Sequence, residues 1–287
     1  MSTFKSLGVA ADFIKGLKEL GIETPTEIQV QTIPLLIKKN TDLIGQAETG
    51  TGKTAAFGLP LLSKIDASKN TVQGLILCPT RELGQQIAKQ LFKYTKYTDK
   101  IFIESVYGGE KIDIQIARLS RPTHVIVATP GRLIDLLSQK IVKLDSVKTV
   151  VLDEADEMLS MGFKDQLDKI LSHLSGAQNK WLFSATLPHE IKAIINTHLN
   201  SDAIRIETNT KSRLNKDIEH QHVICDDKEK LNVLIQFLKS QGNNRGVVFC
   251  RTKAATQVLA KQLQAKNVPA DAIHGDLLQR EREKVMR

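Results

Sequence analysis

Short apolar runs alternate along the chain with longer segments of helical periodicity. Most of these runs are near-continuously apolar, as strands covered by helices on both faces of a sheet must be. Helical patterns separate them, for example over residues 82–94 and 132–138. This alternation predicts an α/β fold in which helices cover both faces of a parallel sheet. The runs lie at residues 74–78, 100–104, 124–128, 149–152 and 181–183.

A polar, basic segment at residues 209–216 interrupts this pattern and is typical of a linker. Only about 70 residues follow it, which is few for an α/β domain. We therefore expect a first domain over residues 1–208 and an incomplete second domain over residues 217–287. After the linker the pattern predicts strands at 220–225, 246–250 and 270–274, with helices at 228–239, 253–266 and 279–286.

A glycine-rich loop joins a predicted strand at 41–46 to a predicted helix at 55–62. Gly50 and Gly52 let the backbone turn tightly and approach phosphate groups without a Cβ in the way. The helix that begins near Lys53 points its free N–H groups and the positive end of its dipole at the same place. This composition predicts a site for a nucleoside triphosphate. The loop comprises Ala47, Glu48, Thr49, Gly50, Thr51, Gly52, Lys53 and Thr54.

The last two residues of this loop carry its chemistry. Lys53 can reach the β- and γ-phosphates, and the Thr54 hydroxyl can ligate Mg²⁺. The general pattern is G-x-x-x-x-G-K-[ST], and Ala47 stands where its first glycine would be. The Gly-Lys-Thr core is intact, so we expect a triphosphate and Mg²⁺ to bind here. The alternative is an ordinary glycine turn beside a chance Lys-Thr pair.

An acidic motif follows the predicted strand at 149–152. A P-loop enzyme needs a carboxylate at a neighbouring strand end to help hold Mg²⁺, and Asp153 fits that role. It also needs a group that orients or deprotonates the attacking water, and Glu154 fits that role. The alternative is a solvated acidic turn. The complete motif is Asp153-Glu154-Ala155-Asp156.

Polar motifs also follow other predicted strands, at 79–81, 129–132 and 184–186. In an open parallel sheet, ligands bind outside the carboxyl ends of the strands. We therefore expect these motifs and the acidic motif to lie along one end of the sheet.

Composition and charge indicate the kind of partner. Hydrophobic residues make up 41% and charged residues 25% of the chain, as in a globular protein with a core. A net charge of +8 and a pI of about 9.3 favour a polyanion such as nucleic acid, although a merely basic enzyme has the same charge. Aromatic residues make up only 5%, so contacts to a nucleic-acid backbone are expected to dominate over base stacking.

The three cysteines are far apart in apolar stretches and have no metal-site or disulfide spacing, which suits a reducing compartment. The N-terminal residues lack an apolar signal core, and no run approaches the roughly 18 apolar residues of a membrane span. We expect a soluble, cytoplasmic protein with no membrane partner. The cysteines are Cys78, Cys225 and Cys250.

With the P-loop and the acidic motif in this order, the chain resembles a DEAD-box ATP-dependent RNA helicase of superfamily 2. Residues 21–29 resemble the family's Q motif, which contacts adenine. The resemblance implies that Gln29 meets adenine N6 and N7 with one amide. Phe4 lies 17 residues before Gly21, at the family's spacing for an aromatic that stacks on the base. The alternative for Phe4 is a packing contact on the first helix.

The resemblance also implies an RNA-binding surface on the first domain. Threonine hydroxyls, glycine N–H groups, arginine guanidinium groups and the helix N-terminus after Gly131 bind phosphate, and none of them identifies a base. Sequence-independent binding to the RNA backbone is therefore expected. The alternative for Arg81 is a surface ion pair with Glu82 or another acid. The implied residues are Pro79, Thr80, Arg81, Gly108, Gly109, Thr129, Pro130, Gly131 and Arg132.

Residues 184–186, Ser-Ala-Thr, resemble the family's coupling motif. By that resemblance the hydroxyls of Ser184 and Thr186 bond the carboxylates of Asp153 or Asp156 and transmit the nucleotide state. A simple strand-end turn is the alternative. The implied catalytic set is Lys53, Thr54, Asp153, Glu154, Ser184 and Thr186, with Thr54 and Asp153 at the metal.

Motifs of the second domain follow in the family's order. Residues 247–252 resemble its V-I-F-x-x-T strand, which implies that Arg251 and Thr252 lie near RNA. Residues 274–276, His-Gly-Asp, and residues 279–282, which contain Q-x-x-R, match the next motifs.

The resemblance covers nearly the whole chain and implies two RecA-like domains, the second one partial. It implies RNA-stimulated ATP hydrolysis coupled to local unwinding of RNA duplexes or remodelling of RNA–protein complexes, with ATP and Mg²⁺ as cofactors. The family's later arginine-bearing motifs would lie beyond Arg287, so we expect this form to bind ATP and RNA but to unwind poorly. Two alternatives stay open: a nucleotide-dependent RNA-binding module without helicase activity, and a DNA-directed superfamily 2 ATPase.

Overall fold

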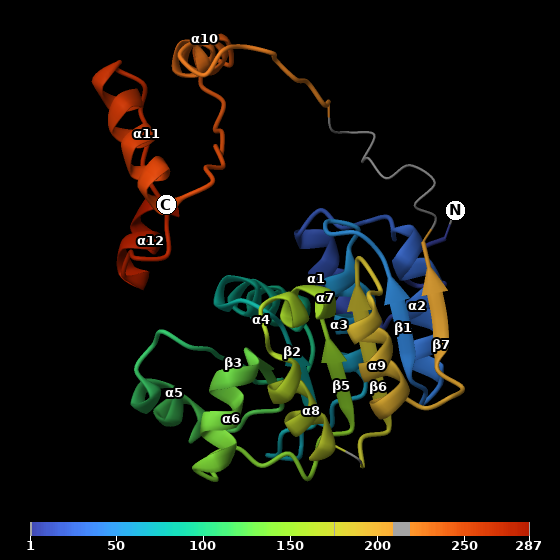
Figure 1. The fold of residues 1–287 in the computed structure, drawn as a ribbon. Helices are drawn as coiled ribbons and strands as arrows, with labels where there is room; N and C mark the ends of the chain where they lie inside the picture. Colours follow the sequence, from blue (N-terminus) through green and yellow to red (C-terminus); the bar gives the residue numbers. More distant parts are fainter. Residues whose placement is uncertain (1, 175, 209–218, 287) are drawn as a thin grey trace. The chain divides into compact units, whose positions relative to one another are not determined.

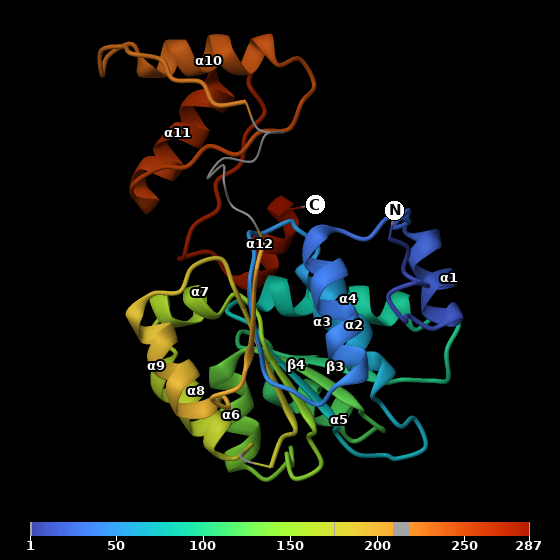
Figure 2. The ribbon, with the colours of Figure 1, turned by 90° about the vertical axis from the view of Figure 1, so that its right-hand side faces the viewer.

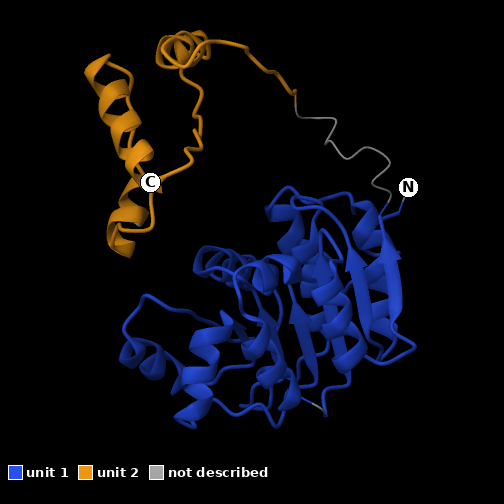
Figure 3. Cartoon of the chain, in the orientation of Figure 1, with its two compact units in different colours: residues 1–211 blue, residues 212–287 orange. Residues whose placement is uncertain are grey.

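A computed structural model describes residues 2–174, 176–208 and 219–286. The chain divides into two compact units, which we call unit 1 (residues 1–211) and unit 2 (residues 212–287) (Figure 3). The predicted linker at 209–216 lies outside the described residues. Each unit is described by itself below.

Unit 1 is built on a seven-stranded sheet in the order β3-β4-β2-β5-β6-β1-β7, and every paired strand is parallel to its neighbour (Figure 1). The predicted α/β fold with a parallel sheet is confirmed. All strands therefore end at one side of the sheet, which we call the carboxyl end. The strands are β1 (Leu43–Gln46), β2 (Gly74–Leu77), β3 (Ile103–Val106), β4 (Val125–Ala128), β5 (Thr149–Leu152), β6 (Asn179–Ser184) and β7 (Ile204–Glu207).

Two layers of helices cover the two faces of this sheet (Figure 2). Successive side chains of one strand pack against opposite helix layers. Ile76 packs into the apolar cluster beneath α1 to α4, whereas Leu75 and Leu77 pack into the cluster beneath α6 to α9. This is why the strand sequences are continuously apolar. The helices are α1 (Ala11–Glu19), α2 (Glu27–Lys38), α3 (Lys53–Ser63), α4 (Arg81–Tyr94), α5 (Ile112–Leu119), α6 (Pro130–Ser138), α7 (Ala155–Ser160), α8 (Lys164–Ser172) and α9 (His189–His198).

The last strand of unit 1 was not predicted from the sequence. β7 (Ile204–Glu207) pairs with β1 at the margin of the sheet, where Ile206 is buried and its neighbours Arg205 and Glu207 are exposed. A short margin strand with one covered face lacks the continuous apolar run that marks the inner strands.

Unit 2 contains the predicted helices but not the predicted strands. The runs at 220–225, 246–250 and 270–274 form no strand within residues 219–286, so that part of the prediction is wrong. Ile224 and Phe249 are 92% and 93% exposed. A strand exists only where a neighbouring strand shares its backbone hydrogen bonds, which an apolar run cannot supply by itself. The helices are α10 (Lys230–Ser240), α11 (Lys253–Ala265) and α12 (Gln279–Met286).

Candidate functional site

The glycine-rich loop connects β1 to α3 at the carboxyl end of the sheet, and α3 begins at Lys53 as predicted. Gly50 and Gly52 have φ angles of +84° and +89°, which L side chains rarely adopt. A Cβ on Gly52 would also lie only 2.4 Å from Nε2 of Gln29. Gly52 is the N-cap of α3, so the unpaired N–H groups of the first helical turn surround this loop.

The P-loop lysine meets the acidic motif across the sheet. Nζ of Lys53, a residue that is 5% exposed, lies 3.4 Å from Oε1 of Glu154, and the Thr49 hydroxyl donates to the same oxygen at 3.1 Å. β1 and β5 both flank β6, so the loops that follow them emerge side by side. Two segments about 100 residues apart in sequence thus form one site.

Glu154 holds an unusual backbone conformation. Its φ of +51° and ψ of +49° lie in the left-handed region, at the N-cap of α7. For a residue with a side chain this conformation costs on the order of 1–3 kcal/mol, and such residues cluster at functional sites. The turn at Glu154 leaves its carboxylate against the P-loop, which argues against the solvated acidic turn.

Asp153 is a buried carboxyl beside this pair. It is 2% exposed, and Glu154 N donates to its Oδ1 at 3.1 Å. Burial raises the pKa of Asp153 to about 7, while the positive charge of Lys53 opposes that rise. A buried acid of this kind is poised to become ionised beside a bound cation.

The coupling motif contacts the acidic motif, but at one carboxylate only. The Thr186 hydroxyl and N–H donate to Oδ2 of Asp156 at 2.7 and 2.9 Å. Ser184 accepts from Asp156 N and donates to Thr186 O, so its hydroxyl bonds backbone and not a carboxylate. Although partial burial opposes it, hydrogen bonding from Thr186 holds the pKa of Asp156 below its usual value. In the described residues neither hydroxyl bonds the Asp153 carboxylate.

The Q-motif glutamine bonds the P-loop directly. Gln29 is 3% exposed; its Oε1 accepts from Thr26 N and its Nε2 donates to Gly52 O, both at 3.0 Å. The sequence did not indicate the contact with Gly52. An amide has two N–H groups and two lone pairs, so one of each remains for a base. Adenine recognition by Gln29 stays a prediction.

Phe4 lies in the apolar core. It is 3% exposed and packs in the cluster that also contains Leu7, Phe13 and Leu17. In this structure the ring therefore has the packing role that the sequence offered as the alternative to base stacking. Stacking on adenine would need a face of the ring that is covered here, so that role has no support from its position.

The predicted RNA-binding residues of unit 1 follow β2, β3 and β4, which are adjacent strands. Arg81 is the first residue of α4, and its guanidinium carbon lies 4.6 Å from the centre of the Tyr107 ring. Gly109 has a φ of +83° in the loop after β3. Thr129 is the N-cap of α6, and Arg132 in the first turn is largely buried at 12% exposure. The sheet therefore brings these three elements to its carboxyl end.

The remaining predicted residues take supporting positions or lie in unit 2. Pro79 and Pro130 are buried, and Thr80 is the N-cap of α4, with its hydroxyl accepting from Leu83 N at 3.3 Å. In unit 2, Arg251 is exposed and the Thr252 hydroxyl caps α11 by accepting from Ala255 N at 3.1 Å. In the glycine-rich loop, Ala47 N donates to Ser184 O, and the Glu48 carbonyl accepts from the Thr51 hydroxyl. The other predicted residues are Thr54, Gly108 and Gly131.

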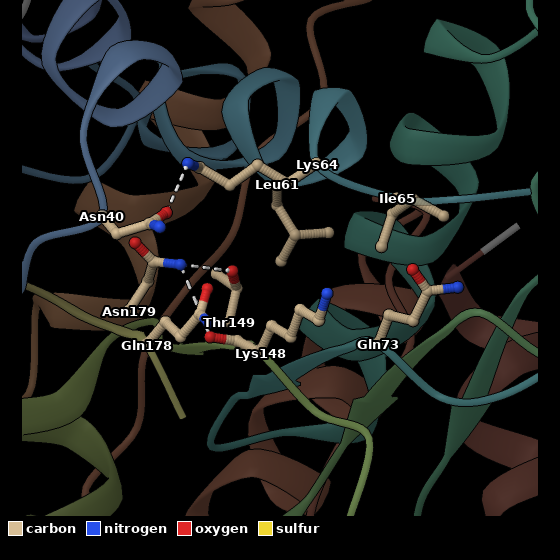
Figure 4. Close-up of a pocket in the computed structure, with 9 residues that line it drawn as sticks. All are labelled: Asn40, Leu61, Lys64, Ile65, Gln73, Lys148, Thr149, Gln178 and Asn179. Atoms are coloured by element: carbon tan, nitrogen blue, oxygen red, sulfur yellow. Dashed lines mark hydrogen bonds between the residues drawn. The ribbon is translucent and has the colours of Figure 1, made fainter. Parts of the chain in front are cut away.

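A cavity of about 210 Å³ lies at the opposite, amino end of the sheet (Figure 4). It is lined by residues just before β1 and β2 and at the start of β5 and β6, with Lys64 from the end of α3. None of its lining residues belongs to the predicted sites. They are Asn40, Leu61, Lys64, Ile65, Gln73, Lys148, Thr149, Gln178 and Asn179.

Two features of the described residues concern metals and membranes. Within them, no group of three or more His, Cys, Asp or Glu side chains is placed to hold a metal ion. Every helix in the same residues is too short or too polar to cross a bilayer. A cytoplasmic location stays a prediction.

Comparison with protein families gives two matches. The family model for DEAD/DEAH box helicases matches residues 26–194, and the model for the helicase conserved C-terminal domain matches residues 229–287. Among curated proteins, the DEAD-box ATP-dependent RNA helicase CshA of Geobacillus kaustophilus is 40% identical over 287 residues, covering 100% of this chain and 61% of the relative. CshA of Listeria monocytogenes is 42% identical over 288 residues, covering 100% and 55%. The chain thus spans a little over half the length of these relatives.

Solved structures agree with this result. A DEAD box protein from Methanococcus jannaschii is 36% identical with a TM-score of 0.69, over 99% of this chain and 76% of that one. Dbp5 of S. cerevisiae bound to RNA and ADP BeF3 is 29% identical with a TM-score of 0.86, over 100% and 72%.

Proposed function

The chain belongs to the DEAD/DEAH box helicase family, and on that premise we propose that it binds ATP and RNA as part of an ATP-dependent RNA helicase. The observation that carries the proposal is the contact of 3.4 Å between Nζ of Lys53 and Oε1 of Glu154. It joins the glycine-rich loop after β1 to a carboxylate at the end of β5, on the far side of β6, and a P-loop enzyme requires such a carboxylate beside its phosphate site. The related CshA proteins are named as ATP-dependent RNA helicases, which supports RNA as the nucleic acid.

The P-loop residues fit a triphosphate with Mg²⁺. The left-handed glycines expose backbone N–H groups, and a side chain at Gly52 would collide with Gln29. We assign phosphate binding to residues 47–54 and the metal to Thr54 and Asp153, since Mg²⁺ bound with phosphates needs only one or two protein carboxylates. When bound, Mg²⁺ neutralises charge on the phosphates.

Hydrolysis is assigned to Glu154. When phosphate binds, Lys53 exchanges its contact with Glu154 for the phosphate oxygens. The freed carboxylate then orients the attacking water and accepts its proton. The bonds from Thr186 to Asp156 connect this motif to the loop after β6, which supports a coupling role for Ser184 and Thr186. Gln29 binds adenine with its remaining N–H and lone pair. Its hydrogen bond to Gly52 O connects this adenine contact to the P-loop.

RNA binding is assigned to the loops after β2, β3 and β4. Arg81, the glycines at 108 and 109, and Arg132 offer guanidinium and backbone N–H groups, which bind phosphate without selecting a base. The positive net charge of +8 supports a polyanionic partner. For unit 2 by itself, we propose the exposed Arg251 and the helix-capping Thr252 as RNA contacts.

A second candidate is an RNA-binding module that does not unwind. The observation that favours it is unit 2, where residues 219–286 form no strand and Phe249 is 93% exposed. We propose a RecA-like domain at 1–208 and a partial RecA-like domain at 217–287, which the two family matches at 26–194 and 229–287 support. With unit 2 in this form, we expect the chain to bind ATP and RNA but to separate duplexes poorly.

The decisive experiment measures ATP hydrolysis with single-stranded RNA, with DNA of the same sequence, and without nucleic acid. We expect RNA to stimulate hydrolysis more than DNA does. Glu154→Gln should lower turnover by about 100-fold or more and leave nucleotide affinity unchanged, because it removes the base but not the phosphate contacts. Glu157→Gln, which replaces an exposed acid in the first turn of α7, is the matched control and should keep full activity.

Each other outcome has a distinct meaning. Full hydrolysis in Glu154→Gln would remove Glu154 from its role. Nucleotide and RNA binding without any hydrolysis in the unaltered chain would favour the second candidate. Equal stimulation by DNA would contradict an RNA-directed enzyme.

A further inference from the structure

A buried glutamine outside the predicted sites clamps the loop that carries Gly108 and Gly109. Gln115 of α5 is 0% exposed. Its Oε1 accepts from Tyr107 N at 3.3 Å, and its Nε2 donates to Tyr107 O at 2.8 Å and to Oε2 of Glu110 at 2.9 Å. Both N–H groups of the amide are used, and together they fix the two ends of the four-residue segment 107–110.

The first end of that segment supports Arg81. Tyr107 is 4% exposed, and the Arg81 guanidinium carbon lies 4.6 Å from the centre of its ring. Nε2 of Gln85 donates to the Tyr107 hydroxyl at 2.7 Å. The ring is thus held at its backbone by Gln115 and at its tip by α4, and it offers a fixed aromatic face to the arginine.

The other end of the segment orients Arg132. The backbone oxygen of Glu110 accepts from Nη2 of Arg132 at 3.0 Å. The Glu110 carboxylate accepts hydrogen bonds from Nε2 of Gln115 and from Nη2 of Arg118. Nε of the same arginine lies 3.7 Å from the Glu104 carboxylate. The negative charge of Glu110 is therefore paired with Arg118, while its backbone oxygen is the atom that bonds Arg132.

We propose that Gln115 is a positioning residue for RNA binding: through Tyr107 and Glu110 it holds Arg81 and Arg132 in one arrangement. The inference rests on the RNA-binding surface proposed above. Free arginine side chains lose much rotamer entropy when they bind a phosphate, and residues that hold them in place beforehand lower that cost. Gln115 itself, being buried, makes no contact with RNA.

The competing explanation is that Gln115 only stabilises the fold, and the chain contains a matched control for it. Gln73 is 5% exposed and also makes three amide hydrogen bonds, which clamp the turn at Asp66–Lys69. It lines the cavity at the amino end of the sheet (Figure 4), away from the proposed RNA-binding surface. Loss of either clamp should affect stability alike, but only loss of Gln115 should affect RNA binding.

The test is fluorescence anisotropy of a labelled 20-nucleotide oligouridine, titrated at one fixed salt concentration with the whole chain and its variants. Gln115→Leu should raise the Kd for RNA by about tenfold or more, and Gln73→Leu by less than about twofold, with nucleotide affinity unchanged in both. Gln115→Asn, whose shorter amide cannot span the segment, should act in the same direction if the leucine variant folds poorly. Fluorescence of Trp181, which is buried in β6, reports on folding.

A double variant separates positioning from general damage. If Gln115 acts through Arg81, then Gln115→Leu combined with Arg81→Ala should weaken RNA binding less than the product of the two single effects. An unchanged RNA Kd in folded Gln115→Leu and Gln115→Asn, an equal loss in Gln73→Leu, or fully multiplicative effects would overturn the inference. Failure of the proposed RNA-binding surface looks different: Arg81→Ala and Arg132→Ala would leave RNA binding unchanged, or the unaltered chain would not bind RNA.

Discussion

Residues 125–128 of unit 1 and residues 246–250 of unit 2 have nearly the same apolar pattern, Val-Ile-Val-Ala and Gly-Val-Val-Phe-Cys, but different structures. The first forms β4, lies between β2 and β3, and is fully buried. The second forms no strand, and Val247 and Phe249 are 80% and 93% exposed. The difference shows that an apolar run becomes a strand only when neighbouring strands complete its hydrogen bonds and helices cover it.

For the same reason, the residues of the candidate nucleotide site come together in unit 1. The contact between Lys53 and Glu154 depends on β1 and β5 lying on either side of β6. Without a sheet, the loops that follow the apolar runs have no common end at which to meet. Thr252 and the motif at 274–276 therefore lack, within the described part of unit 2, the scaffold that assembles the site in unit 1.

We expect the largest effect on stability when the same substitution, isoleucine to alanine, is compared between the two units. Ile76→Ala in β2 removes a fully buried side chain and should lower the free energy of unfolding by about 2–5 kcal/mol. Ile224→Ala in unit 2 removes a side chain that is 92% exposed and should change the free energy of unfolding by less than about 0.5 kcal/mol. Urea unfolding followed by far-UV circular dichroism, which reports on both units, measures the two values. Comparable losses would mean that Ile224 is packed in solution.

A smaller effect concerns the buried acid of unit 1. Burial raises the pKa of Asp153 from 3.8 to about 7, so the folded state binds this proton more tightly than the unfolded state does. Between about pH 4 and 7 the unfolded chain has lost the proton while the folded chain keeps it, so this group lowers stability as the pH rises. Asp153→Asn removes the cost of ionising this buried group. Without nucleotide or Mg²⁺, the free energy of unfolding of this variant, relative to that of the unaltered chain, should rise by on the order of 2 kcal/mol between pH 5 and pH 8.

Trp181 fluorescence during thermal unfolding measures this effect, because the buried indole reports on unit 1. Asp145→Asn, which replaces an exposed acid in the loop before β5, is the control: it keeps Asp153, so its stability should fall with pH as that of the unaltered chain does. A difference between Asp153→Asn and the unaltered chain that stays constant with pH would contradict the raised pKa.

The sequence predicted the parts of unit 1 whose signal is local. The inner strands carry continuous apolar runs, and the glycines at 50 and 52 mark a loop with left-handed backbone, both of which the structure contains. The Gln29–Gly52 bond and the Gln115 clamp were missed, because single glutamines carry no pattern and their partners are set by tertiary packing. The strands of unit 2 were predicted wrongly, because the apolar pattern cannot report whether a neighbouring strand is present.

The most direct test of the central claim, that unit 1 presents a nucleotide site at the carboxyl end of its sheet, is a titration with a fluorescent ATP analogue with and without Mg²⁺. We expect binding that needs Mg²⁺, and an affinity weakened by about tenfold or more in Lys53→Ala, because that lysine starts α3 beside the glycines of the loop. Lys64→Ala, at the other end of the same helix, should bind as the unaltered chain does. Equal affinity in Lys53→Ala and the unaltered chain would contradict the account.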